Sequence, residues 1–224
     1  IYPQGWLARP IEKQGQQQAS WRLDPKQSGI GGCIGDIGSH SENLAEYISG
    51  LKITEVCAEL TAFIEGRPID DDANCFLRFD NGAKGVLHTS QISIGEENGL
   101  ALWVYGEKAS LERHQEHPNY LYVKTPDAPV QVWRRGNGYV GAKSPAAGRA
   151  TRLPFGHPEA FIEAFANIYV NAGDTIRAVL AGVKPDPLAL DFPTVEDGLR
   201  GMLFIETVVK SGKSKNKWAP MPSL

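Results

Sequence analysis

The chain has 224 residues, of which 42% are hydrophobic and 22% charged, and its formal net charge is -3. This length and apolar content predict one domain over 1–224 with a substantial core. The charge argues against nucleic acid or an anionic membrane as the main partner, and no apolar run approaches the ~20 residues of a membrane span. Three cysteines without a C-x-x-C pair favour a reduced, cytoplasmic setting.

The first predicted elements lie on either side of a glycine-rich turn. Residues 16–22 favour a strand, and residues 34–49 carry apolar side chains at helical spacing up to Gly50, which is a typical helix stop. Tyr47 and Ile48 are expected on or near the apolar side of that helix. The glycines between the two elements are Gly29, Gly31 and Gly32.

Strand patterns dominate the middle of the chain. Asn81-Gly82 is a strong signal for a two-residue hairpin turn. The register that it implies pairs Cys75 with His88 and Asn74 with Thr89. The predicted strands cover residues 53–63, 73–79, 83–92, 100–105, 110–113, 120–123 and 130–133.

Helices return in the last third. Residues 136–152 are rich in Gly, Ala and Ser and are expected to form a long loop. Pro158 suits the first position of a helix whose apolar residues extend to Val179. Residues 194–197 resemble a capping box that opens a last helix through Val209. This order predicts an α+β fold, a mostly antiparallel open sheet with helices on one face.

Asp36 and His40 are the strongest candidates for chemistry. Four residues apart in a helix, they share one face. Asp36 can then hold the His40 imidazole in one orientation, leaving the other ring nitrogen free to transfer a proton near neutral pH. Capping at the start of a helix explains the same residue types, so spacing alone leaves a structural role open.

A family resemblance favours the catalytic interpretation. Gly31-Gly32-Cys33-Ile34-Gly35-Asp36-Ile37-Gly38-Ser39-His40 resembles the G-G-x-x-x-D-x-G-x-H signature of the glucose–fructose oxidoreductase/inositol dehydrogenase (Gfo/Idh/MocA) family. Residues 21–25, 77–85 and 104–111 resemble other elements of its C-terminal domain, so the similarity covers nearly the whole chain. Residues 156–169 resemble a subgroup that oxidises sugars or sugar derivatives. The resemblance implies that family's C-terminal, substrate-binding fold.

The resemblance does not extend to a nucleotide-binding domain. Members of the family begin with a Rossmann domain that binds NAD or NADP and carries a catalytic lysine. A G-x-G-x-x-G stands at Gly136–Gly141, but it falls in the long loop expected over 136–152 and not between a predicted strand and a predicted helix, and the chain contains no P-loop. We therefore expect the C-terminal half of a longer enzyme, with NAD or NADP bound by the full-length enzyme and no cofactor bound by this chain alone.

Other polar clusters are predicted to be structural. His88, His114 and His117 lack the spacing of metal ligands, so no metal site is expected. Asp70-Asp71-Asp72 is typical of a polar turn. The lysines of residues 210–217 suit a solvated helix end better than a nucleic-acid site.

Three further residues are candidates for substrate contact. Trp21 and Arg22, at the end of the first predicted strand, could stack on a sugar and bind its hydroxyl groups. His157 lies just before a predicted helix and could meet a substrate hydroxyl. A packing role for Trp21 and a capping role for His157 remain open.

Together these features predict the substrate-binding and catalytic half of an NAD(P)-dependent oxidoreductase that acts on a sugar, polyol or sugar derivative. His40 would be the proton acceptor and donor, and Asp36 would orient it. The alternative is a non-catalytic sugar-binding or assembly module with the same scaffold. A metal-dependent hydrolase lacks the necessary ligand spacing.

The open sheet predicts self-association. In the predicted hairpin, Leu77 and Val86 lie on one face and Phe76 and Leu87 on the other, so both faces are apolar. Helices can cover only one of them. The resemblance implies subunit pairing through the second face, and we expect a homodimer or homotetramer.

Overall fold

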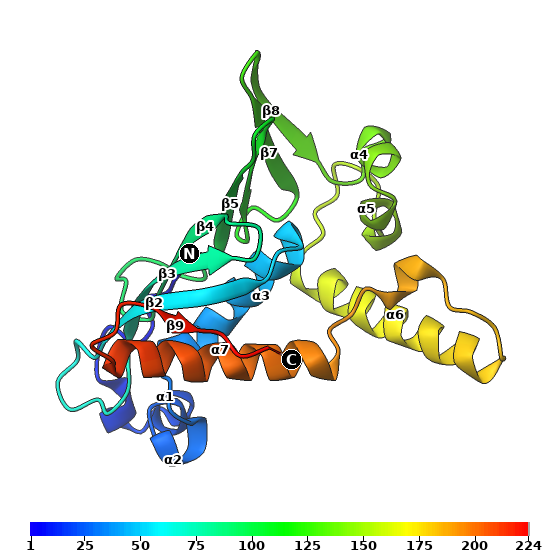
Figure 1. Ribbon diagram of the computed structural model, residues 1–224. Helices are drawn as coiled ribbons and strands as arrows, with labels where there is room; N and C mark the ends of the chain where they lie inside the picture. Colours follow the sequence, from blue (N-terminus) through cyan, green and yellow to red (C-terminus); the bar gives the residue numbers. More distant parts are fainter. Residues whose placement is uncertain (224) are drawn as a thin grey trace. The chain divides into compact units, whose positions relative to one another are not determined.

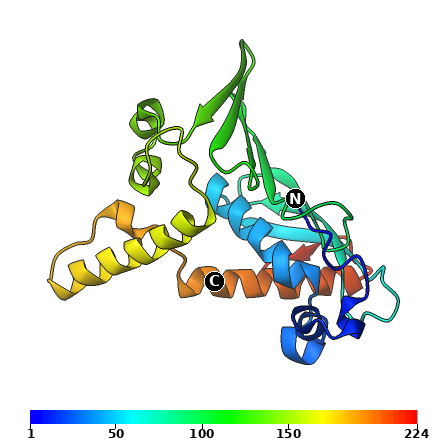
Figure 2. The same cartoon turned by 180° about the vertical axis from the view of Figure 1, so that it is seen from behind.

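The computed structural model describes residues 1–223, which form two compact units (Figures 1 and 2). Unit 1 comprises Ile1–Leu102 and the C-terminal segment that begins at Val195, and unit 2 comprises Trp103–Thr194. Among the described residues, no helix combines the length and the apolar character needed to cross a bilayer.

Unit 1 is built on a five-stranded sheet in the order β1-β4-β3-β2-β9. The β1–β4 pair is parallel and the other pairs are antiparallel. Figure 1 shows α7 running beside β2 and β9. The elements of unit 1 are β1 (Tyr2–Pro3), the 3₁₀ helix η1 (Ile11–Gln14), α1 (Gln17–Arg22), α2 (Pro25–Ser28), the π-helical turn η2 (Ile34–Gly38), α3 (Ser39–Ser49), β2 (Ile53–Thr61), β3 (Asp72–Phe79), β4 (Lys84–Ser90), α7 (Val195–Lys213) and β9 (Ala219–Pro220).

Helices cover one face of this sheet, as the α+β prediction expects. Apolar residues from η2 and α7, among them Ile34 and Phe204, join inward-facing strand residues such as Val56 in one buried cluster. The opposite face is open, with Phe76 59% exposed and Val86 67% exposed. The predicted fold class, a mostly antiparallel open sheet with helices on one face, is confirmed.

The strand predicted for residues 16–22 is wrong, because this segment forms α1. The Gln16 side chain accepts a hydrogen bond from the Ala19 backbone nitrogen at 2.7 Å and so caps the first turn. Ala19 is fully buried and packs with Leu7 and Leu23 in a second, small apolar cluster. The N-terminal cap and the burial of Ala19 in this cluster together specify a short helix.

The predicted hairpin register is wrong by one residue. Asn74 pairs with His88 rather than with Thr89, because the turn has three residues instead of two. Phe79 and Ala83 close it, and Gly82 takes a positive φ of 89° in its last position. The shift also changes the faces, so that Leu77 and Leu87 both point into the core while Phe76 and Val86 share the open face.

The helix predicted for residues 34–49 is confirmed as η2 followed by α3. In α3, however, the buried side carries polar side chains. Glu42 and Glu46 are buried, whereas Tyr47 and Ile48 are exposed. Arg200 of α7 donates to Glu46 Oε1 at 2.8 Å, and Lys52 Nζ donates to its Oε2 at 2.9 Å. These charges compensate the burial of Glu46, so α3 docks on α7 through an ion-pair network.

Glu42 makes the stability of the chain depend on pH. Burial raises the pKa of its carboxyl group to about 7, with a further upward effect from Glu46 that Arg200 and Lys52 oppose. The folded chain therefore holds a proton that the unfolded chain releases near pH 4.5. The contribution of Glu42 to the free energy of unfolding is therefore complete below pH 4.5 and is lost as the pH rises to about 7.

We expect Glu42→Gln to remove this loss, because a neutral amide needs no proton to stay buried. Between pH 5 and pH 8 the wild-type chain should lose on the order of 3 kcal/mol of stability that the variant retains. Urea denaturation at the two pH values measures the difference. Glu65→Gln, at an exposed position, is the control and should leave the wild-type pH dependence unchanged. Parallel pH dependence in the wild type and in Glu42→Gln would contradict the prediction.

Unit 2 contains a four-stranded sheet in the order β5-β6-β7-β8 and a long helix, α6. The chain enters this unit within β5. The elements are β5 (Ala101–Tyr105), β6 (Ser110–His114), β7 (Tyr120–Thr125), β8 (Ala128–Arg134), α4 (Gly138–Lys143), α5 (Pro145–Ala150), α6 (Phe161–Leu180) and the 3₁₀ helix η3 (Pro187–Leu190).

Two predictions for unit 2 need correction. The long loop expected over 136–152 contains α4 and α5, because Ser144 caps α5 with its hydroxyl and Pro145 begins it. The long helix begins at Phe161 rather than at Pro158. Glu163 Oε2 accepts a hydrogen bond from the Ala160 nitrogen at 2.9 Å and fixes this later start.

Candidate active site

The glycines of the signature bring the start of η2 onto a buried carboxylate. Asp70 accepts hydrogen bonds from the backbone nitrogens of Gly32 and Ile34 at 2.7 and 2.8 Å and from the Cys33 thiol at 3.1 Å. A Cβ atom on Gly32 would lie 1.9 Å from the Asp70 carbonyl oxygen, so this approach requires glycine. Asp70 thus satisfies free donors at the helix start and fixes the turn that presents Asp36.

The polar turn predicted for residues 70–72 is wrong at its first two positions. Asp70 is 6% exposed and Asp71 is completely buried. Asp71 accepts hydrogen bonds from the nitrogens of Phe63 and Ile64 and pairs with Arg67. Both carboxylates therefore satisfy buried donors and hold neighbouring segments together.

Asp36 is held by side chains from two other elements. Arg22 Nε of α1 donates to Asp36 Oδ2 at 3.1 Å, and Gln91 Nε2, just after β4, donates to the same oxygen at 2.8 Å. Within residues 1–223, Oδ1 has no hydrogen-bond partner. Asp36 lies inside a π turn, a rare geometry that is frequent at functional sites.

Arg22 is itself fixed by aromatic rings. Its guanidinium carbon lies 4.3 Å from the centre of the Trp21 ring and 5.8 Å from that of Trp6. Its Nη1 donates to Gln18 Oε1 at 2.6 Å. The structure therefore brings Trp21, Arg22 and Asp36 together, although on a helix and not at the predicted strand end.

His40 lies one turn beyond Asp36, in α3, and its side chain is exposed. Its ring is tilted by 59° to the ring of the buried Tyr2, with the centroids 6.1 Å apart. The described residues show no hydrogen bond between Asp36 and His40, and the two hydrogen bonds that Asp36 accepts from side chains come from Arg22 and Gln91. The orienting role of Asp36 therefore remains a prediction.

Gln91 and Asp70 were not singled out from the sequence. Gln91 belongs to no motif, and in the sequence it is one polar residue near the end of the strand predicted over 83–92. For Asp70, the signal is indirect. The backbone nitrogens that follow Gly31 and Gly32 begin a helix and need a buried hydrogen-bond acceptor.

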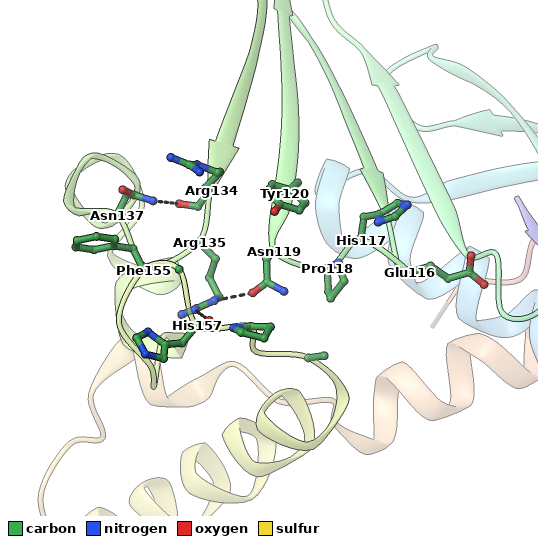
Figure 3. A pocket seen from close by; sticks show the side chains of 13 residues that line it. Glu116, His117, Pro118, Asn119, Tyr120, Arg134, Arg135, Asn137, Phe155 and His157 are labelled. Carbon is green, nitrogen blue, oxygen red and sulfur yellow. Dashed lines mark hydrogen bonds between the residues drawn. The ribbon is translucent and has the colours of Figure 1, made fainter.

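His157 lies in unit 2, where it lines a pocket of about 510 Å³ (Figure 3). The wall comes from the turn between β6 and β7, the end of β8 and the stretch before α6. Within the described part of the chain, the His157 ring has no hydrogen-bond partner. The pocket volume lies in the range of small-molecule sites.

Arg135 builds this pocket rather than offering it a free cation. Its Nε donates to Asn119 Oδ1 at 2.8 Å, and Figure 3 shows this bond. Its other nitrogens donate to the carbonyl oxygens of Leu153 and His157 and pair with the buried Glu159. These contacts make the pocket wall rigid, and the pair with Glu159 compensates the positive charge of Arg135.

The described residues show no cluster of metal ligands, and a carboxylate occupies the glycine turn before η2. Among residues 1–223, no three His, Cys, Asp or Glu side chains are placed to hold a metal ion. In the described sheet of unit 1, β1 and β4 are the strands that run parallel. The glycine-rich segment Gly29–Gly32 leads into the π turn η2, whose first backbone nitrogens are capped by the Asp70 carboxylate. A negative group already occupies the helix start that would otherwise attract a phosphate.

Comparison with known proteins gives a consistent family assignment. The family profile described as "GFO/IDH/MocA C-terminal domain" matches residues 2–112. The chain is 29% identical over 219 residues to the uncharacterized oxidoreductase YfiI of Bacillus subtilis, covering 97% of this chain and 55% of YfiI. It is 25% identical over 251 residues to levoglucosan dehydrogenase of Pseudarthrobacter phenanthrenivorans, covering 100% of this chain and 58% of that enzyme.

A solved structure agrees with this assignment. An inositol dehydrogenase homolog from Azotobacter vinelandii, complexed with NADH and myo-inositol, has a TM-score of 0.81 and 28% identity, covering 98% of this chain and 55% of that one. The structure of an inositol dehydrogenase homolog from the same organism, complexed with NAD+, has a TM-score of 0.84 and 30% identity, covering 98% of this chain and 56% of that one. The chain thus spans little more than half the length of these relatives.

Proposed function

Because the chain belongs to the GFO/IDH/MocA family of oxidoreductases, we propose that it is the substrate-binding and catalytic part of an NAD(P)-dependent dehydrogenase that acts on a sugar, polyol or sugar derivative. The observation that supports this proposal is that Arg22 and Gln91 hold the Asp36 carboxylate four residues before His40, whose side chain is exposed. The relatives' names support the substrate class, since one is a levoglucosan dehydrogenase and another was solved with myo-inositol.

The chain's own part in the reaction is the transfer of a proton. We propose that His40, whose side chain is exposed, takes the proton from a substrate hydroxyl while the carbon that bears it loses a hydride and becomes a carbonyl, and that His40 returns the proton in the reverse reaction. Asp36 stabilises the imidazolium that forms. A bound nicotinamide supplies the hydride acceptor.

Three residues are proposed to contact substrate. Trp21 is 36% exposed and offers a ring face to a sugar. Arg22 uses Nε and Nη1 within the protein, and its Nη2 has no hydrogen-bond partner among the described residues, so it can donate to a hydroxyl. His157 is proposed to bind a hydroxyl from its pocket in unit 2.

We expect cofactor binding to require a domain beyond these 224 residues, because the G-x-G-x-x-G at Gly136–Gly141 follows β8, a strand paired antiparallel with β7, and does not open a βαβ unit. Calorimetry with the chain alone should detect no micromolar binding of NAD or NADP. The protein extended by the proposed Rossmann domain should bind one of them and reduce it with a cyclic polyol or sugar. Tight binding by the chain alone would refute the first expectation. An extended protein that binds a sugar without oxidising it would favour the non-catalytic module.

We expect the chain to form a homodimer through the open sheet face of unit 1. Phe76 and Val86 lie directly opposite each other there and are mostly exposed, and an open apolar face is unfavourable in a monomer. Sedimentation equilibrium at micromolar concentration should show a dimer or tetramer, and Phe76→Glu should shift it towards monomer. Ile94→Glu, also at an exposed position but in a loop, should not. A monomeric wild-type chain would contradict this prediction.

A further inference from the structure

We propose that Gln91 is a positioning residue for Asp36, and that the site consequently offers only one carboxylate oxygen, Oδ1, to His40 or to substrate. This inference rests on the proposed function, in which Asp36 acts beside His40. Its basis is the convergence of Gln91 and Arg22, from separate elements, on the single oxygen Oδ2.

Gln91 is placed by its surroundings with little freedom to move. The residue is 2% exposed. Its backbone nitrogen donates to the Asp71 carbonyl oxygen, and its own carbonyl oxygen accepts from the Leu7 nitrogen, both at 2.9 Å. A buried side chain on a backbone fixed from both sides is a rigid support.

The two supports of Asp36 differ in charge and in mobility. An ionised carboxylate only accepts hydrogen bonds, so the amide nitrogen of Gln91 must face it. This neutral amide fixes the direction of the carboxylate without cancelling its charge. Arg22 supplies the charge, and its side chain rests on the Trp21 and Trp6 rings but is 26% exposed, whereas Gln91 is 2% exposed. Gln91 is the support whose removal should release the Asp36 side chain.

The free oxygen then determines what Asp36 can do. With Oδ2 occupied twice, only Oδ1 remains to accept a hydrogen bond from an imidazole N–H or a substrate hydroxyl. Rotation about χ1 would carry the whole carboxylate away and misplace the acceptor. Displacements of this kind reduce catalysis by up to about 100-fold without removing a reacting group.

The test compares Gln91→Met, which keeps the length but removes the donor, with Thr89→Val as the matched control. Thr89 lies two residues earlier in the same segment, is completely buried, and its hydroxyl has no hydrogen-bond partner among the described residues. In the 224-residue chain, three-bond NMR couplings to Asp36 Cγ report the χ1 angle. We expect one rotamer in the wild type and in Thr89→Val, and averaged couplings in Gln91→Met.

Kinetics of the protein with its cofactor domain give a second readout. Gln91→Met should lower kcat by about 10- to 100-fold and change KM by less than about 3-fold, whereas Thr89→Val should change neither. Unaveraged couplings in Gln91→Met would overturn the proposal, even if activity fell. An unchanged kcat or a selective rise in KM would overturn it as well. If the protein proves to have no dehydrogenase activity, the proposed function fails and the couplings alone decide the positioning role.

Discussion

Replacing His40 by alanine is expected to lower turnover of the complete dehydrogenase by about 10²- to 10⁴-fold, the usual contribution of a general base. Asp36→Asn should have a smaller effect of the same kind, because it weakens the stabilisation of the imidazolium without removing the proton acceptor. Steady-state kinetics between pH 6 and pH 9 measure both effects.

Folding should survive the His40 substitution, since the side chain is exposed and surface changes usually cost less than about 0.5 kcal/mol. Asn43→Ala, at another exposed position of α3, is the control and should keep normal turnover. Near-normal turnover of His40→Ala across the whole pH range would show that another group accepts the proton.

Gly32→Ala is expected to be the most damaging small substitution in the signature. The new Cβ would lie 1.9 Å from the Asp70 carbonyl oxygen. The backbone cannot move away without breaking the hydrogen bonds from Gly32 and Ile34 to the Asp70 side chain. We expect a loss of about 3 kcal/mol or more in the free energy of unfolding, measured by urea denaturation.

Gly35→Ala is the matched control, three residues further in the same turn. Its Cβ would meet nothing closer than an Ile205 methyl group at 4.0 Å. Because alanine favours helix over glycine by about 1 kcal/mol, this variant should be as stable as the wild type or slightly more stable. Equal destabilisation by both substitutions would mean that the Asp70 contact is not what requires glycine at position 32.

The sequence was a good guide where local pattern decides the structure. The helix from residue 34, the strands β2, β3 and β4 and most of α6 follow from the spacing of apolar residues. The errors arose where one local hydrogen bond or one turn residue decided the outcome. A single glutamine cap turned 16–22 into a helix, and one additional turn residue moved Leu77 and Leu87 onto the same face.

The candidate site shows the same division. Asp36 and His40 could be named from their spacing and from the signature, because both lie within one local segment. Gln91 follows Asp36 by 55 residues and Asp70 follows Gly32 by 38. Contacts over such separations depend on how the sheet brings β4 and η2 together, which a pattern of nearby residues does not encode.

The three thiols differ in how accessible they are to an alkylating reagent. Cys33 and Cys75 are buried, and burial raises the pKa of the Cys33 thiol, which also donates to Asp70, and that of Cys75 to about 12. Cys57 is only partly buried and lies opposite Phe76 on the open face. Alkylation of Cys33 and Cys75 should therefore follow opening of the core, and alkylation of Cys57 should follow dissociation of the proposed dimer, so that one labelling time course distinguishes the two events.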